Sequence, residues 1–294
     1  MQKLFYDELK RKIKKEIYKS YYSTLYLLDN DEVLKIFQPS YLEAGSYYDL
    51  DMEKKVIDKE KYESGISKNI VVPTGIVYSN NGEFMGYTMP YIYGKDYNQI
   101  EEDITKEDRE NFNTFNPFFH DLEKIIKESK EVVIPDLCTC ENIFIEPNGN
   151  VKLLDYDGMQ IGDNMTLTSS TSIYPLPYYF NQKKYCENGL LTKQLDIQSI
   201  YFLYFLTTFN VDLLKVGRTD PFSGRVISLE DIFRIINLKD PELMHKVWKI
   251  FQKNEVNEYL GDTIDKLEEN YRMKVEGTIE KNKEKYYFKR LYRK

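Results

Sequence analysis

The chain has 294 residues and a mass of 35.1 kDa, which suits one large domain or two smaller lobes that share a core. Hydrophobic residues make up 41% of it and charged residues 30%, a balance that excludes a disordered chain. The 14 glycines and 10 prolines exclude a collagen-like protein, and the net charge of -7 argues against general nucleic-acid binding.

Neither membrane insertion nor export is expected from the sequence. No apolar run approaches the roughly 18–20 residues that a membrane helix needs, and charged residues stand where a signal peptide has its apolar stretch. The three cysteines include no CxxC pair, which is typical of a reducing cytoplasm. Residues 271–294 carry nine Lys or Arg against three Glu, so this basic tail predicts a solvated helix, or contact with an acidic partner or a membrane surface.

The first part of the chain predicts a sheet with few helices. Apolar residues near a spacing of 3.6 predict an amphipathic helix over Lys3–Tyr18, and the charged segment Asp51–Tyr62, without Gly or Pro, predicts a second helix. Short β-branched or aromatic runs bounded by turn residues predict four strands: Thr24–Leu28, Glu32–Phe37, Asn69–Tyr78 and Glu83–Tyr93.

The chain after Gly94 is predicted to be mainly helical. The helical patterns cover Asn116–Ser129, Gln194–Phe209, Glu242–Gln252 and Thr263–Glu280. Between them, Asn142–Glu146 and Val151–Asp155 predict a hairpin around Asn148-Gly149, the strongest short hairpin signal. A Ser- and Thr-rich loop follows over Gly158–Ser172.

Three segments carry polar groups in a distinctive order. Lys35 lies among apolar residues in Glu32-Val33-Leu34-Lys35-Ile36-Phe37, where a lysine costs desolvation unless an anion meets it. Pro135-Asp136-Leu137-Cys138-Thr139-Cys140-Glu141-Asn142 leads into the hairpin, and Asp155-Tyr156-Asp157-Gly158 leaves it. An Asn at the entry of a hairpin and an Asp at its exit lie at one end of the sheet. These segments resemble the Lys-bearing strand, catalytic loop and metal-binding strand end of the protein kinase superfamily.

The resemblance implies an α+β fold of two lobes. Residues 1–90 would form a small β-rich N-lobe, with the N-terminal helix, an antiparallel sheet and a Glu-bearing helix. Residues 91–294 would form a larger helical C-lobe, with the catalytic loop, the activation segment around Tyr174–Tyr179 and the basic tail. Mg²⁺ and ATP would bind between the lobes, and the γ-phosphoryl group would pass to a Ser or Thr hydroxyl of a protein substrate.

The resemblance also implies a role for each polar group. Asp136 would accept the proton of the substrate hydroxyl, and Lys35 would meet the nucleotide phosphates. Glu53 is expected to pair with Lys35, although Glu43, Glu60 and Glu63 lie nearby and are open alternatives. The metal ligands would be Asn142 and Asp155.

Two further segments extend the resemblance. Thr88-Met89-Pro90-Tyr91-Ile92-Tyr93-Gly94 is similar to the hinge that binds adenine in the family. Met89, Pro90 and Ile92 are the expected contacts, through the Pro90 carbonyl and the Ile92 N–H. Asp196 begins a segment that resembles the central helix of the large lobe, where an Asp holds the backbone of the catalytic loop.

The sequence departs from the family at the phosphate loop. The family's glycines fall at Tyr18, Ser20 and Ser23, so only a looser loop built on the two serines is expected to hold phosphate. Ile134 and Pro135 stand where His and Arg are usual.

The spacing of the loop and the triplet after it also differ. Asn142 follows Asp136 by six positions rather than five, and Asp157 replaces a glycine. These departures leave three alternatives open: a pseudokinase that binds nucleotide as a scaffold, a phosphotransferase that acts on a small-molecule alcohol, and transfer of the nucleotide itself.

Overall fold

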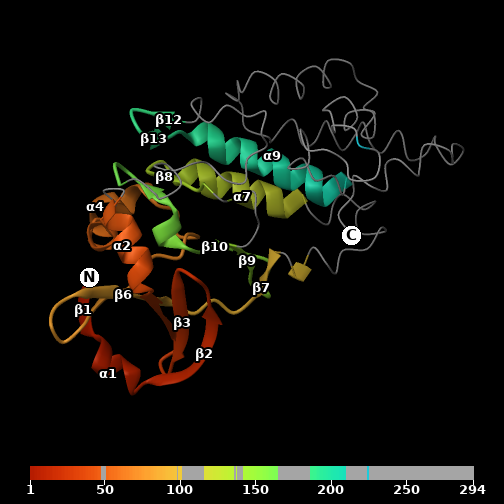
Figure 1. Cartoon of the computed structure of the whole chain (residues 1–294). Coiled ribbons are helices and arrows are strands. Elements are labelled where there is room, and N and C mark those ends of the chain that lie inside the picture. Colours follow the sequence, from red (N-terminus) through yellow and green to blue (C-terminus); the bar gives the residue numbers. More distant parts are fainter. Residues whose placement is uncertain are drawn as a thin grey trace, which may run out of the picture.

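A computed structural model of the protein describes residues 1–47, 51–97, 99–100, 116–135, 137, 142–164, 186–209 and 224 (Figure 1). Six strands of the N-terminal part form one sheet in the order β1-β5-β6-β4-β3-β2. β1 and β5 run parallel and the other neighbours run antiparallel. The strands are β1 (Gln2–Phe5), β2 (Ile13–Lys19), β3 (Ser23–Leu28), β4 (Glu32–Phe37), β5 (Gly75–Tyr78) and β6 (Phe84–Pro90).

The predicted helix over Lys3–Tyr18 is wrong. These residues form β1, the short helix α1 (Tyr6–Lys10) and most of β2. The apolar residues of this segment are divided between pairings with β5 and β3, and two register irregularities in β2 break the alternation that marks a strand. Periodicity alone therefore favoured the wrong element.

Short helices connect β4 to β5. They are α2 (Pro39–Tyr47), α3 (Met52–Ile57), α4 (Lys59–Tyr62) and the 3₁₀ turn Glu63–Gly65. The helix predicted over Asp51–Tyr62 is divided at Asp58, which ends α3 and precedes α4. Asp51 caps α3, because its carboxylate accepts the Lys54 N–H at 2.8 Å.

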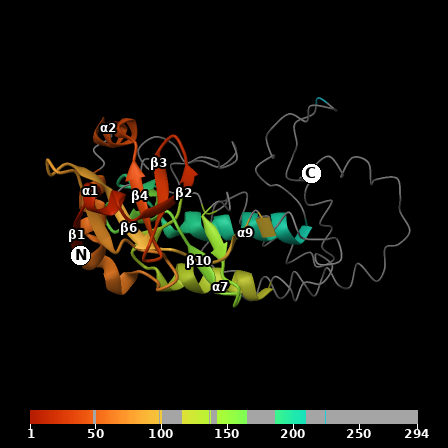
Figure 2. The ribbon, with the colours of Figure 1, turned by 90° about the horizontal axis from the view of Figure 1, so that it is seen from below.

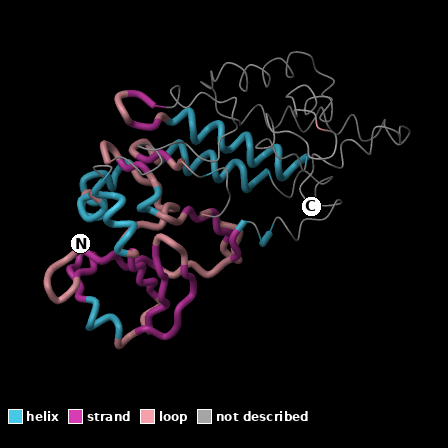
Figure 3. Tube along the Cα trace, viewed as in Figure 1, coloured by secondary structure: helices cyan, strands magenta, loops and turns pink. Residues whose placement is uncertain are grey.

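Two long helices follow the sheet along the chain and lie side by side (Figures 1 and 2). They are α7 (Asn116–Glu128) and α9 (Lys193–Phe209), and they confirm the predicted helices Asn116–Ser129 and Gln194–Phe209 to within one residue. The Phe119 and Tyr204 rings meet between them at 5.2 Å. The described chain is thus a mixed α and β structure, with its large sheet and its long helices in different regions (Figure 3).

The remaining strands are short. β7 (Lys95–Asp96), β9 (Ile143–Ile145) and β10 (Val151–Leu153) form a three-stranded sheet, in which β9 and β10 confirm the predicted hairpin. β8 (Val132–Val133) pairs with β11 (Gln160–Ile161), and β12 (Cys186–Glu187) pairs with β13 (Leu190–Leu191). The 3₁₀ turn η4 (Tyr156–Gly158) follows the hairpin.

The six-stranded sheet buries side chains on both faces. On one face Leu9 of α1 packs against Leu28, Leu34 and Val77. On the other face a larger cluster joins β4, β5 and β6 to α2 and α3. Its members are Val33, Phe37, Tyr41, Met52, Val56, Val71, Ile76, Tyr78, Tyr87 and Met89.

Backbone hydrogen bonds tie the hairpin to the chain that precedes β5. The Leu153 N–H donates to the Asn69 carbonyl at 2.9 Å, and the Leu153 carbonyl accepts the Val71 N–H at 2.8 Å. This tie holds the end of β10 beside the sheet that carries Lys35.

No helix of the described residues is long and apolar enough to cross a membrane. The predicted helices Glu242–Gln252 and Thr263–Glu280, the segment Tyr174–Tyr179 and the basic tail lie outside the described residues.

Candidate functional site

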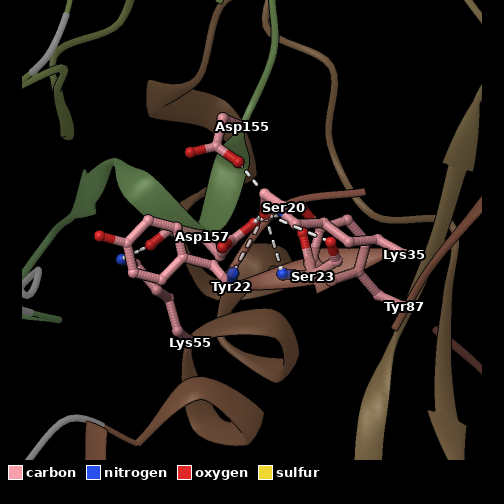
Figure 4. A network of polar contacts seen from close by, with 8 residues as sticks. All are labelled: Ser20, Tyr22, Ser23, Lys35, Lys55, Tyr87, Asp155 and Asp157. Atoms are coloured by element: carbon pink, nitrogen blue, oxygen red, sulfur yellow. Dashed lines mark hydrogen bonds and ion pairs between the residues drawn. The ribbon is translucent and has the colours of Figure 1, made fainter. Parts of the chain in front are cut away.

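Lys35 is buried in the centre of the sheet. It lies on β4, opposite Leu25 of β3 and Tyr87 of β6, so all three side chains share the face that packs against α3. Its ammonium group forms ion pairs with Asp155 and with Asp157, the second at 2.5 Å (Figure 4). Burial disfavours the ammonium ion, but the two carboxylates outweigh burial and hold the pKa of Lys35 well above its ordinary value.

The β9–β10 hairpin brings Asn142 and Asp155 to one end. Leu153 lies opposite Ile143, and the Leu154 N–H donates to the Asn142 carbonyl at 2.9 Å. Asp155 follows directly, in the left-handed backbone conformation at φ 68° and ψ 52°. Such strain in a residue other than glycine persists where its surroundings impose it. The backbone of the hairpin therefore has Asn142 at its entry and Asp155 at its exit, at the same end, as the sequence predicts.

Gly158 leaves room for the Asp155 side chain. The Gly158 N–H donates to the Asp155 carbonyl at 2.9 Å and closes the turn η4. A Cβ atom at Gly158 would collide with Oδ2 of Asp155. The Asp155 side chain keeps 32% of its surface exposed, so it is the accessible carboxylate of the pair. Burial and the charge of Asp157 raise its pKa.

Asp157 is the enclosed carboxylate, with only 5% of its side chain exposed. It accepts hydrogen bonds from Lys35 and from the Tyr87 hydroxyl, the latter at 2.6 Å. Burial by itself raises the pKa of this carboxyl, but Lys35 and Tyr87 stabilise its charge and lower the pKa below the ordinary value. Burial and the charge of Asp157 raise the pKa of Tyr87 well above its ordinary value, so Tyr87 stays a hydrogen-bond donor.

Lys55 is a second buried ammonium group at the same turn. It projects from α3, is 1% exposed, and donates to the backbone carbonyl of Asp157 at 2.6 Å. The Tyr156 hydroxyl in turn donates to the Lys55 carbonyl at 3.5 Å. Burial lowers the pKa of Lys55 to about 8, against the opposing charges of Asp157 and Asp155.

Glu53 does not take the expected place beside Lys35. Its carboxylate accepts a hydrogen bond from the Tyr78 hydroxyl at 2.7 Å. Burial and this hydrogen bond raise the pKa of Tyr78 to about 12. The expected ion pair of Lys35 with Glu53 is therefore corrected: Lys35 pairs with the two aspartates of the η4 turn instead.

The reason lies in how α3 is turned. Met52, Lys55 and Val56 are its buried residues, at the i, i+3 and i+4 positions of one helical face. Glu53 lies off this face and is only partly buried. The apolar residues Met52 and Val56 mark the buried face in the sequence, and the same spacing places Lys55 on it, so this residue was open to prediction but was missed.

The serines at the β2–β3 turn bind their own loop. The Ser20 hydroxyl accepts the N–H groups of Tyr22 and Ser23, each at 3.1 Å, and donates to the Ser23 carbonyl at 3.2 Å (Figure 4). The Ser20 N–H also donates to the Ser23 carbonyl, at 2.9 Å. The Ser20 hydroxyl, which was expected to help hold phosphate, is engaged within its own loop in this structure, and Tyr18 is exposed nearby on β2.

The segment expected to bind adenine lies at the end of β6. Within this segment Met89 is buried and Pro90 is exposed. Ile92 is partly buried and packs against the larger core cluster, which contains Met52 and Val56 of α3. The Tyr91 N–H donates to the Asp31 carbonyl at 3.1 Å. This bond anchors the chain as it leaves the sheet.

Asp196 holds the chain before the expected catalytic loop. Its buried carboxylate accepts the Ile134 N–H at 2.7 Å and pairs with Lys193 at 2.9 Å. Burial raises the pKa of Asp196, although both partners oppose this. The backbone contact implied by the kinase resemblance is therefore present. Asp136, two residues after Ile134, lies outside the described residues.

The oxygen ligands at the hairpin end suit Mg²⁺ bound together with a nucleotide. Asp155 carries a partly exposed carboxylate and Asn142 a side-chain amide, while the enclosed Asp157 carboxylate is bound by both Lys35 and Tyr87. Among the described residues no group of three or more His, Cys, Asp or Glu forms a complete metal site. Mg²⁺ commonly binds one or two protein oxygens and completes its shell with water and phosphate, so the donor set fits.

A separate cavity of about 130 Å³ lies away from this site. It is lined by residues of the opposite side of the sheet, among them Leu4, Leu9, Leu28 and Thr88. Lys35 and Asp155 are in direct contact and do not line it. The cavity therefore does not mark the charged cluster.

No protein-family model matches the sequence, and a comparison with curated proteins finds no match. The functional conclusion therefore depends on the residues and contacts described above.

Proposed function

We propose that this chain is a two-lobed, kinase-like phosphotransferase that binds Mg²⁺ and ATP and transfers the γ-phosphoryl group to Ser or Thr hydroxyls of a protein. One observation carries the proposal: Lys35, on a central strand, forms an ion pair with Asp155, at the end of a hairpin 120 positions later. A buried ammonium group beside an accessible carboxylate suits a metal-bound triphosphate, because the first can meet the phosphates and the second can bind the metal.

A second, independent contact supports the proposal of a kinase-like protein. Asp196 accepts the Ile134 N–H and thereby fixes the chain that leads to Asp136. The strand, the hairpin and the start of α9 come from three distant parts of the sequence, yet their polar residues occur in the order that the kinase resemblance implies. This agreement between the order in the chain and the contacts in space supports the proposal.

Each group has a chemical task under this proposal. Lys35 neutralises charge on the phosphates, and its high pKa keeps it protonated throughout the physiological range. Asp155 and Asn142 hold Mg²⁺, which when bound offsets the charge that develops on the transferred group. Asp136 accepts the hydroxyl proton of the protein substrate.

The direct test follows the label of ATP in the purified full chain. We expect label from the γ-phosphate, but not from the α-phosphate, to appear on a generic protein substrate or on the chain itself. Asp136→Ala and Asp155→Ala should abolish the transfer, since they remove the base and a metal ligand. Label from the α-phosphate on the acceptor would instead indicate nucleotide transfer, and label on a small alcohol would identify a different substrate class.

A second candidate function is a nucleotide-binding module without turnover. The specific observation in its favour is the β2–β3 turn, whose N–H groups donate to Ser20 instead of facing outward. If the protein transfers no label with Mg²⁺ or Mn²⁺ but unfolds at a higher temperature with ATP, this candidate replaces the first. If the protein transfers no label and ATP does not change its unfolding temperature, both candidate functions are wrong.

A further inference from the structure

The alignment of Lys35 requires a partner that keeps its ammonium group in place. The helix carboxylate expected for this task, Glu53, is bound to the Tyr78 hydroxyl at 2.7 Å. We propose that Asp157 positions Lys35 in place of a helix carboxylate, and that Tyr87 and Lys55 hold Asp157 for this purpose. The inference rests on the proposed function for its role in catalysis, but the positioning itself is a property of the protein alone.

Asp157 and Asp155 both touch Lys35, but they differ in accessibility. The Asp157 side chain is 5% exposed and the Asp155 side chain 32%. A metal ion reaches the more exposed carboxylate, Asp155, first, and that carboxylate then turns from Lys35 toward the metal. Asp157 remains as the fixed anion, so Lys35 keeps one partner while the other is exchanged.

Two donors from different elements fix Asp157. The Tyr87 hydroxyl from β6 donates to the carboxylate at 2.6 Å, and Lys55 from α3 donates to the backbone carbonyl at 2.6 Å. Side chain and backbone are thus held separately, and neither donor is exposed to water. Charged hydrogen bonds of this kind are stronger than neutral ones when they are buried.

In this arrangement the η4 turn, and not α3, supplies the anion that holds the Lys35 ammonium group in place. Asp157 belongs to the same short turn as Asp155, whereas Glu53 belongs to α3. Lys35 and the metal-binding carboxylate are therefore aligned by one turn. The helix contributes through Lys55, a cation that binds the turn, rather than through an anion that binds Lys35.

The first test measures Lys35 without any nucleotide. An amine-reactive ester is applied at mildly alkaline pH, and peptide mass spectrometry gives the labelling rate of Lys35 in Asp157→Asn, Glu53→Gln and wild type. Asp157→Asn should raise that rate at least tenfold, because Lys35 loses the enclosed anion that holds its ammonium group in the interior. Asp163→Asn, an exposed aspartate bonded to Tyr62, is the matched control.

An effect of Glu53→Gln equal to that of Asp157→Asn, or no effect of Asp157→Asn, overturns the proposal. If Asp157→Asn does not fold, Tyr87→Phe replaces it in the test, because it removes the hydroxyl that donates to Asp157. The labelling rate of Lys35 should then be at least threefold above that of wild type. An unchanged rate also overturns the proposal. ATP titration of the same proteins separates the two claims. Failure of wild type to bind ATP refutes the proposed function, while the labelling result still decides how Lys35 is held.

Discussion

Lys55 should give the protein a specific dependence of stability on pH. Burial lowers its pKa from the ordinary 10.5 to about 8. Below about pH 8, Lys55 is charged in both the folded and the unfolded chain, and its buried charge destabilises the folded chain. Between these values the folded chain has released the proton and the unfolded chain still binds it, so the free energy of unfolding rises with pH.

The size of the rise follows from the displacement of the pKa. Each unit corresponds to about 1.4 kcal/mol, so Lys55 contributes a rise of about 3 kcal/mol over the full interval. Lys55→Met keeps an unbranched side chain but removes the titrating group. It also leaves the Asp157 carbonyl without its donor, which costs about 1–3 kcal/mol at every pH. The cost of the lost hydrogen bond does not change with pH, so it does not hide the rise in the free energy of unfolding with pH.

The assay is urea unfolding of wild type and Lys55→Met in small pH steps from neutral to strongly alkaline. The free energy of unfolding of the variant, subtracted from that of wild type, should rise by about 3 kcal/mol between the two pKa values. Other titrating groups occur in both proteins and cancel in the difference. Lys54→Met, at the exposed neighbour on α3, should give a flat difference curve. A flat curve for Lys55→Met would refute the argument from burial.

Three further substitutions test the turn, the anchor and the loop. Gly158→Ala places a methyl group against the Asp155 carboxylate, so Mg²⁺-dependent ATP binding, measured by calorimetry, should weaken at least tenfold; unchanged affinity would contradict the geometry. Asp196→Ala leaves the Ile134 N–H unpaired in the interior and should lower the free energy of unfolding by about 3–5 kcal/mol in urea, and a loss below about 1 kcal/mol would show that the contact matters little. Ser20→Ala removes the acceptor of two turn N–H groups and should cost about 1 kcal/mol in thermal unfolding; equal stability would mean that water replaces the hydroxyl fully.

Elements stabilised by local signals were predictable from the sequence. Glu32–Phe37 was predicted with the bounds that β4 has, and the Asn148-Gly149 pair located the hairpin, because turn chemistry acts within a few residues. The segment before Lys19 was not predictable in this way. β1 is defined by its parallel pairing with β5, from Gln2 opposite Gly75 onward, and no local pattern encodes so distant a partner.

The candidate site was predictable in part. Lys35 and Asp155 were expected at the same nucleotide site, and they lie together, because their positions follow from a strand and a hairpin that local signals specify. The buried partner of Lys35, Asp157, could not be predicted from the sequence. Whether Glu53 or Lys55 faces the core depends on how α3 packs, and Asp157 becomes a partner of Lys35 only because the η4 turn directs it inward.

The tie between the hairpin and the chain before β5 has a mechanical consequence. Both of its backbone hydrogen bonds meet at Leu153, two residues before Asp155. The neighbouring Lys152 adds a hydrogen bond from its ammonium group to the Asn69 side chain at 3.2 Å, so the tie is confined to two adjacent residues of β10. If Lys35 and the η4 turn separate to admit a ligand, we therefore expect this tie to stay closed and the gap to open most at the edge farthest from it.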